Sequence, residues 1–409
     1  MLHRKPVENF DWFLIIPRAQ MNNKLMNTYA ALPLAFDRGE GAWLWDEDGN
    51  RYLDAISGLG VCGLGHAHPD VTRVIADQAG KLIHTANLAR IPWQEKLAGK
   101  LVEITGMDRV FVANSGTEVI ECALKITRLI GHRLGLKKPG VIVMENSFHG
   151  RSLAALSATG SRKVQAGFEP LVGGFLRVPF ADADAVEKLA NSSNEVAAVL
   201  VEPIQGEAGI KVPQKGYLKR LREICDDNGW LLIFDEIQSG LCRTGRWYAH
   251  QHEEVQPDIL TTAKALANGI PIGACVARGA AAEAFSPGRH GSTFGGNPLA
   301  TRTACTVLDI MKAEDLNARA EQTGNSMLNA FRSRIQDHPN VKVIRGRGLM
   351  IGIELDRDVN SFKTIALKQG LLLNITRDNV IRLLPPLIID EAQADEIVDT
   401  VCQLIESLE

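Results

Sequence analysis

The sequence predicts an α/β protein whose large central sheet is mostly parallel. Short apolar runs rich in β-branched residues alternate with longer amphipathic stretches through the middle of the chain. This alternation is typical of strands joined by helical crossovers. Seven such runs lie between residues 109 and 277, so we expect a seven-stranded sheet. The pattern changes at both ends of the chain, which predicts a smaller α+β domain assembled from both termini.

The expected strands of the large sheet are 109–113, 141–144, 175–178, 197–202, 230–234, 258–262 and 272–277. Helical patterns lie between several of them, including 185–192 and 217–229, where Gly229 is a typical residue for a helix end. Residues 41–56 predict a β-hairpin with Asp48-Gly49 in its turn. A long helical stretch follows residue 300, then strands within 341–355 and 380–386 and a final helix over 391–408.

The domain organisation follows from this order of elements. We expect residues 1–70 to form an N-terminal segment and part of the small domain, 71–300 the large domain, and 301–409 the rest of the small domain. A prior of about 150 residues per domain agrees with two to three units in a chain of this length.

Composition narrows the class of protein. Lysine and arginine number 45 against 48 acidic residues, giving a net charge of −3, so no basic surface for nucleic acid is expected. The apolar run at 12–16 is too short for a signal peptide, and no run reaches the ~18 residues of a membrane span. The 7 cysteines form no CxxC pair, which fits reduced thiols in a cytoplasmic protein without a membrane partner.

Two acids, Asp235 and Glu236, stand at the end of the apolar run 230–234. A buried carboxylate costs several kcal/mol unless it is paired. Lys264 follows the next expected strand, 264 − 235 = 29 residues later, about one crossover unit away. A cation 4 Å from Asp235 would gain roughly 4 kcal/mol at an effective dielectric near 20. That cation is either Lys264 or a ligand with a protonated ring nitrogen, and we expect Glu236 to be a structural acid.

Two further motifs follow expected strands. Ser115, Gly116 and Thr117 stand where a strand passes into a helix, and backbone N–H groups there suit a phosphate. Alone, this motif is equally well a plain helix cap. In the next loop, Phe148 is suited to stack on a flat ring and Arg151 to bind a carboxylate with two hydrogen bonds. Taken alone, these residues more often serve packing, and the neighbouring histidine fits structural hydrogen bonding as well as catalysis.

One ligand satisfies these motifs together. Pyridoxal 5′-phosphate carries a phosphate for the turn at 114–117, a ring nitrogen for Asp235 and an aldehyde for Lys264. A metal is not expected, because His66-x-His68 and His250-x-His252 have no carboxylate or thiol at ligand spacing. A role in turns is the simpler interpretation of both histidine pairs.

Together these motifs resemble the class III aminotransferases, pyridoxal-phosphate enzymes of fold type I. The resemblance extends from LGHAHP (64–69) to RLLPP (382–386) and includes SGTE (115–118), SFHGR (147–151), VEPIQGEAG (201–209), DEIQSGLCRTG (235–245), the surroundings of Lys264 and GSTFGGNPLA (291–300). Within the class, GLGHAHP and GSTFGGNPLA are most similar to acetylornithine aminotransferases, followed by ornithine aminotransferases.

The resemblance implies a role for each residue that faces the cofactor. Lys264 binds the cofactor aldehyde covalently, Asp235 pairs with the ring nitrogen and Gln238 hydrogen-bonds the ring hydroxyl. Phe148 stacks on the ring. The phosphate is held by the turn at 115–117, chiefly through Gly116 and Thr117.

The resemblance also implies a homodimer with its active sites at the subunit interface. Ser292 and Thr293 would come from the partner subunit, Thr293 to the cofactor phosphate. Arg151 would bind the α-carboxylate of an ω-amino substrate and Arg382 that of glutamate. Glu207 would neutralise Arg382 while the other substrate occupies the site.

The implied reaction transfers the terminal amino group of N-acetylornithine to 2-oxoglutarate, giving N-acetylglutamate 5-semialdehyde and glutamate, a step of arginine biosynthesis. Ornithine, 4-aminobutyrate and succinylornithine are alternative donors. An isomerase on the same scaffold would not need the Glu207–Arg382 pair, and a non-catalytic scaffold would be expected to lack Lys264 or Asp235.

The sequence departs from the family pattern at three places. Val119-Ile120 replace a common Ala-Asn, and Cys242 replaces a usual glycine. Leu59 stands where ornithine aminotransferases tend to carry tyrosine, which counts modestly against free ornithine.

Overall fold

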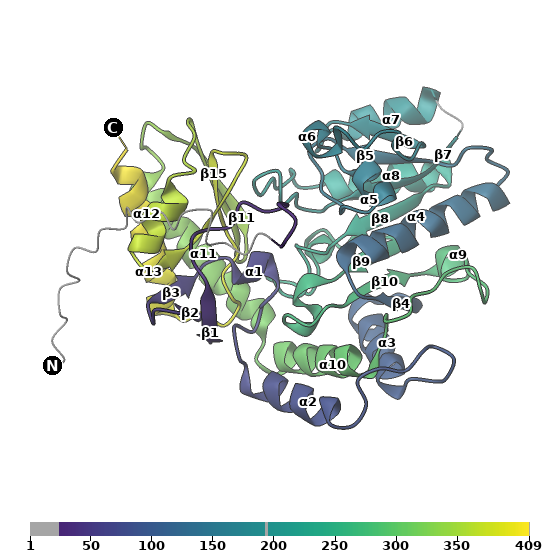
Figure 1. The fold of residues 1–409 in the computed structure, drawn as a ribbon. Coiled ribbons are helices and arrows are strands. Elements are labelled where there is room, and N and C mark those ends of the chain that lie inside the picture. Colours follow the sequence, from purple (N-terminus) through teal and green to yellow (C-terminus); the bar gives the residue numbers. More distant parts are fainter. Residues whose placement is uncertain (1–23, 193–194, 409) are drawn as a thin grey trace.

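A computed structural model describes residues 24–192 and 195–408, arranged in three β-sheets with helices packed around them (Figure 1). The apolar run expected at 12–16 lies outside the described residues. The seven-stranded sheet lies on one side of the molecule, and the two four-stranded sheets lie on the other with the C-terminal helices.

The large sheet has the strand order β4-β10-β9-β8-β7-β5-β6. β10 runs antiparallel to both of its neighbours, and the other neighbouring pairs are parallel, so the predicted mostly parallel sheet is confirmed. Two predicted strands match their bounds and the other five are shifted by one residue at one or both ends. The bounds are β4 Arg109–Ala113, β5 Gly140–Met144, β6 Phe175–Val178, β7 Val196–Val201, β8 Leu231–Asp235, β9 Ile259–Thr262 and β10 Gly273–Ala277.

Helices cover both faces of this sheet. Alternate residues of β7 show the division, since Leu200 packs in the cluster with α4 (Gly116–Arg133), whereas Val199 packs with α8 (Tyr217–Asn228) and α7 (Ala183–Ser192). Both faces of the inner strands are therefore apolar, which explains the continuous hydrophobic runs in the sequence. Helix α8 ends at Gly229, whose φ of 67° is left-handed, as predicted.

Both ends of the chain build the two smaller sheets. The N-terminal strands β1 (Phe36–Glu40), β2 (Trp43–Asp46) and β3 (Arg51–Asp54) pair in order, and β13 (Leu371–Leu372) joins β3 in parallel. The predicted hairpin and the small domain from both termini are thus confirmed. The other small sheet contains β11 (Val341–Arg347), β12 (Met350–Leu355), β15 (Val380–Leu383) and β14 (Asn374–Thr376).

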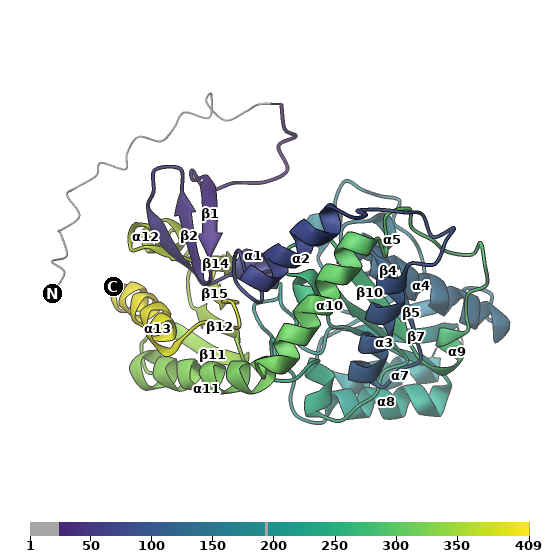
Figure 2. The ribbon, with the colours of Figure 1, turned by 90° about the horizontal axis from the view of Figure 1, so that it is seen from below.

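The other helices of seven or more residues divide between the two parts (Figure 2). In one group, α2 (Pro69–Ala79), α3 (Pro92–Thr105) and α10 (Pro298–Ala313) pack together beside the large sheet, and in the other, α11 (Leu316–Ile335), α12 (Phe362–Lys368) and α13 (Glu391–Glu406) lie with the small sheets. One hydrophobic cluster includes Leu64, Val71, Ile272 and Leu308, so residues on both sides of positions 70 and 300 share a core. The domain boundaries at these positions stay predictions. Within the described ranges, no helix is both long and apolar enough to span a bilayer.

Candidate active site

A cavity of about 400 Å³ opens where the large sheet's strands end, which is where open α/β sheets place ligands. Its lining includes Gly116, Phe148, Asp235, Gln238 and Lys264. Residues that follow β4, β5, β7, β8 and β9 therefore converge on one space, as the sequence predicted for a single ligand.

The turn after β4 forms one end of the cavity. Ser115 caps α4 by accepting a hydrogen bond from the backbone N–H of Glu118 at 3.4 Å. Gly116 leaves no room for a side chain, because a Cβ there would lie 2.9 Å from a methyl carbon of Ile237. The start of this 18-residue helix thus presents backbone N–H groups to the cavity, a favourable place for an anion.

The hydroxyl of Thr117 belongs to a short hydrogen-bond chain. Ser152 Oγ donates to Glu121 Oε1 at 2.5 Å and lies 2.7 Å from Thr117 Oγ1. A serine hydroxyl has one proton, so in this arrangement the Thr117 hydroxyl donates to Ser152. A phosphate at the turn would therefore have to draw the Thr117 proton away from Ser152.

The loop after β5 supplies a ring and a cation. Phe148 and Arg151 both line the cavity, with the guanidinium carbon of Arg151 5.6 Å from the centre of the Phe148 ring. Arg151 is itself exposed, which leaves its guanidinium accessible to a carboxylate entering from solvent.

His149 is a site residue whose role the sequence left open. Its ring Nδ1 lies 2.7 Å from Asp235 Oδ2, and both side chains are almost wholly buried. Asp235 Oδ1 accepts a backbone hydrogen bond from Ile237 at 3.1 Å and one from the Thr261 hydroxyl at 3.5 Å. Of the two roles that the sequence left open, this geometry favours the structural one, in which His149 fixes the carboxylate at the end of β8. Because 86 residues separate the partners, no local sequence pattern could reveal this contact.

Lys264 stands two residues beyond β9, beside β8 as predicted. Its backbone φ of 42° is positive, an uncommon conformation for a residue with a side chain and one that concentrates at functional sites. Burial lowers the pKa of Lys264 to about 8, even though Glu207 and Asp235 work in the opposite direction. The amine is consequently available in its neutral form close to neutral pH.

This pKa predicts how Lys264 will react in the cofactor-free protein. The rate at which an aldehyde attaches to Lys264 should rise with pH and level off above about pH 8 instead of above pH 10, because attack requires the neutral amine. Glu207→Gln should move this transition to lower pH, since Glu207 raises the pKa of the lysine. Stopped-flow absorbance measures both. A transition that stays at the same pH in Glu207→Gln would contradict the electrostatic assignment.

Glu207 and Arg382 form an ion pair at the edge of the cavity. Arg382 Nη1 lies 2.5 Å from Glu207 Oε1 and 3.5 Å from Gln238 Oε1. The Arg382 side chain is 2% exposed and that of Glu207 38%. Although burial disfavours its charge, Arg382 holds the pKa of Glu207 below its usual value. Glu207 lines the cavity and covers Arg382, which is not itself among the lining residues.

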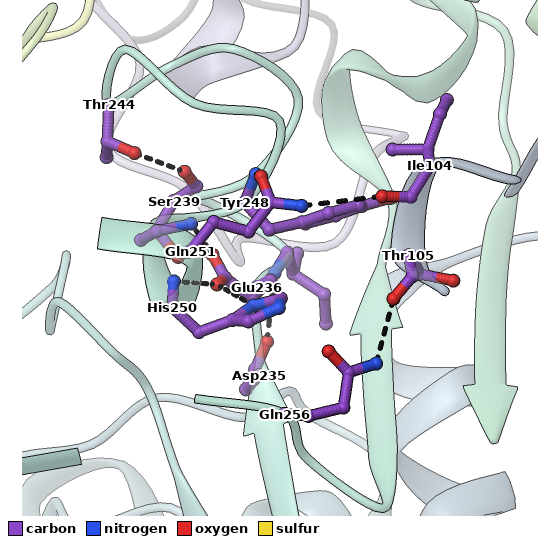
Figure 3. A network of polar contacts seen from close by, with 12 residues as sticks. Ile104, Thr105, Asp235, Glu236, Ser239, Thr244, Tyr248, His250, Gln251 and Gln256 are labelled. Carbon is purple, nitrogen blue, oxygen red and sulfur yellow. Dashed lines mark hydrogen bonds and ion pairs between the residues drawn. The ribbon is translucent and has the colours of Figure 1, made fainter. Parts of the chain in front are cut away.

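Glu236 faces away from the cavity and forms part of a buried network (Figure 3). Its carboxylate accepts hydrogen bonds from the Ser239 hydroxyl, two backbone amides and the His250 ring. Burial opposes the charge, but His250 and Ser239 hold the pKa of Glu236 below its usual value. The network fixes the segment after Asp235, which agrees with the structural role expected for Glu236.

The predicted partner-subunit residues are not part of this cavity. Ser292 Oγ instead accepts a hydrogen bond from Asn114 Nδ2 of the same chain at 3.0 Å. Thr293 and Phe294 are exposed beside it, and neither lines the cavity.

The three departures from the family pattern lie outside the cavity as well. Cys242 has a φ of 67°, which explains why glycine suits that position.

No group of three or more histidine, cysteine or acidic side chains in the described ranges is arranged to hold a metal ion.

Comparison with known proteins identifies the family. The model for aminotransferase class-III matches residues 25–405. The chain belongs to this family. The acetylornithine aminotransferase of Nitrosomonas europaea is 53% identical over 381 residues, covering 93% of this chain and 97% of that protein. The Aquifex aeolicus protein of the same name is 45% identical, with 93% and 99% covered.

Solved structures of the class share the fold. The ornithine aminotransferase of Toxoplasma gondii has a TM-score of 0.91 at 37% identity, covering 94% of this chain and 93% of that one. The acetylornithine aminotransferase of Elizabethkingia anophelis has a TM-score of 0.85 at 34% identity, with 94% and 97% covered.

This class III aminotransferase uses pyridoxal phosphate, and the cavity has the chemistry to hold that cofactor. It brings together a helix start for a phosphate, an aromatic ring, a buried carboxylate for a ring nitrogen and a lysine amine. The volume of about 400 Å³ lies within the range usual for small-molecule sites.

Proposed function

We propose that this aminotransferase transfers the terminal amino group of N-acetylornithine to 2-oxoglutarate, giving N-acetylglutamate 5-semialdehyde and glutamate in arginine biosynthesis. Relatives named acetylornithine aminotransferase, from bacteria and archaea, support the choice of donor at 42–53% identity. Each of them is covered over at least 96% of its length, so the comparison concerns whole proteins.

The observation that carries the proposal is the Glu207–Arg382 pair. One pocket must accept first a donor whose reacting end carries no carboxylate and then 2-oxoglutarate, which has a carboxylate beside its reacting carbon. With the pair closed at 2.5 Å, the charge of Arg382 is covered and the donor can enter. When Glu207 moves away, Arg382 can bind the incoming carboxylate with two hydrogen bonds.

The other residues have complementary roles in the proposed reaction. When bound, pyridoxal phosphate withdraws electrons from the carbon that carries the transferred amine. Lys264 Nζ would take the proton from that carbon and donate it to the carbon on the other side of the transferred nitrogen. Asp235, fixed by His149, holds the ring nitrogen in its protonated form, and Arg151 binds the α-carboxylate of the donor.

Initial rates on a panel of donors test the substrate assignment. With 2-oxoglutarate as acceptor, kcat/KM for N-acetylornithine should exceed that for ornithine and 4-aminobutyrate by at least about tenfold, which needs only about 1.4 kcal/mol of discrimination. Succinylornithine completes the panel as the closest analogue. A higher kcat/KM for ornithine would contradict the proposed donor and would identify the protein as an ornithine aminotransferase, a group whose structures share the fold.

We infer a homodimer from the surface around Phe294. Phe294 is 63% exposed, Leu88 97% and Ile83 55%, and Asn87 ties their two segments together by donating to Gly295 O at 3.1 Å. Exposed apolar side chains gathered in this way are typical of an interface. The interface would also bring Ser292 and Thr293 to the partner's cofactor phosphate.

Replacing Phe294 by aspartate should weaken the dimer and lower activity together, because a buried charge would be left unpaired at the interface. The matched control is Leu134→Asp, since Leu134 is equally exposed, at 63%, at the end of α4. Sedimentation velocity should show two chains per particle in the native protein and the control. A fully active single chain would contradict the proposed interface.

We also propose a cytoplasmic location. The cysteines of the described chain are all free, and six of the seven are buried, as expected where thiols stay reduced.

A further inference from the structure

Glu202 is a second acid in the cavity, and the reaction described above does not use it. It follows β7 directly and lines the same cavity as Asp235. The two residues are 6% and 4% exposed. Two buried carboxylates that face one space rarely carry charge together, because each raises the free energy of ionising the other.

The hydrogen bonds indicate which of the two acids is ionised. Asp235 faces the His149 ring at 2.7 Å in addition to a backbone amide and a hydroxyl. Among the described residues, Glu202 receives only backbone amides, from Phe148 to Oε2 at 3.1 Å and from Gly206 to Oε1 at 3.4 Å. Within the same part of the chain, no cationic side chain is hydrogen-bonded to Glu202. Asp235 is therefore the better site for the single negative charge.

The charged groups around Glu202 also favour its neutral form. Burial, followed by the negative charges of Asp235 and Glu207, raises the pKa of Glu202 well above its usual value. Lys264 is the nearby cation, but Glu207 and then Asp235 act on it more strongly than Glu202 does. The attraction between Lys264 and an ionised Glu202 is therefore the weakest of these three interactions with acids.

We propose that Glu202 is a positioning residue that works as a neutral carboxylic acid, fixing the amides of Phe148 and Gly206 and directing its proton into the cavity. We place this proton on Oε1, which makes the longer of the two amide contacts. The inference rests on the proposed function in one respect, that the cavity holds pyridoxal phosphate.

The two amides connect Glu202 to two residues that are expected to contact the cofactor ring, Phe148 and Gln238. Phe148 is the residue expected to stack on the ring. Gly206 supports Gln238, since a Cβ at Gly206 would lie only 1.9 Å from Gln238 Oε1. A neutral Glu202 holds both without adding a second negative charge near Asp235.

Infrared spectroscopy of the cofactor-free protein tests the protonation state directly. At neutral pH the native protein should show the C=O stretch of a protonated carboxylic acid, and Glu202→Gln should remove it. Glu103→Gln is the control, because Glu103 is 69% exposed and pairs with Lys312 on the surface, and it should leave the band unchanged. A spectrum without a band that depends on Glu202 would overturn the proposal. No substrate is present, so the outcome is independent of which amino donor the enzyme uses.

Rescue by the conservative variant tests the positioning role in the holoenzyme. Glu202→Gln keeps an oxygen acceptor and an N–H donor without charge, so kcat/KM should stay within about threefold of the native value. Glu202→Leu leaves two buried amides without acceptors and should lose about tenfold or more. Equal losses in the two variants would contradict a neutral acid. If the leucine variant does not fold, the infrared band and the glutamine variant still decide.

Discussion

Replacing Lys264 by alanine should lower turnover by at least about 10³-fold and abolish the absorbance of the lysine-bound cofactor. The proposed role of Lys264 as both attachment point and proton carrier explains the size of the effect, since positioned proton transfer alone contributes 10²–10⁴-fold. Steady-state rates and the visible spectrum of the purified variant measure the two losses separately.

The control for this variant is Lys312→Ala. Lys312 lies on α10, its side chain is 71% exposed, and it pairs with Glu103 on the surface at 3.1 Å. Its loss should change the rate by less than about twofold, because an exposed ion pair contributes little to stability. Turnover near the native rate in Lys264→Ala would refute the assignment of the lysine.

Arg382→Ala should damage one half of the reaction far more than the other. Without the guanidinium, kcat/KM for 2-oxoglutarate should fall by about 10- to 100-fold, the effect of losing a hydrogen-bonded pair between charged groups. The half-reaction with N-acetylornithine should fall less, because its carboxylate is assigned to Arg151. Single-turnover absorbance changes separate the two half-reactions.

Glu207→Gln should produce the opposite asymmetry. Arg382 would then remain uncovered, so the glutamate half-reaction should be preserved while the N-acetylornithine half-reaction weakens. Equal losses in both half-reactions for both variants would show that the 2.5 Å pair is structural rather than a means of accepting two substrates in turn.

Much of the fold could be predicted because its inner strands are buried on both faces. Runs such as 197–202 and 230–234 are apolar over almost their whole length, and the strands β7 and β8 lie within one residue of these predicted bounds. The small sheet formed by β1–β3 and β13 was harder to predict from the sequence. β13 has two residues and pairs with a strand more than 300 positions earlier, and no local pattern encodes such a partner.

Some residues of the site could likewise be predicted from the sequence, and others could not. Asp235 and Lys264 could be predicted together because neighbouring parallel strands bring their carboxyl ends to one edge. The contact between His149 and Asp235 could not, since it depends on how the loop after β5 folds over β8. Glu202 was hidden for a different reason. A single acid at the end of a strand resembles any solvated carboxylate until its burial and its neighbours are known.

We expect pyridoxal phosphate to be bound covalently to Lys264 in the cavity beside Asp235. Borohydride reduction of the holoenzyme, followed by proteolysis and mass spectrometry, tests it most directly, because reduction fixes a lysine-bound aldehyde as a stable amine. We expect one labelled peptide, carrying phosphopyridoxyl on Lys264. Labelling of a different lysine, or none after saturation with the cofactor, would contradict it.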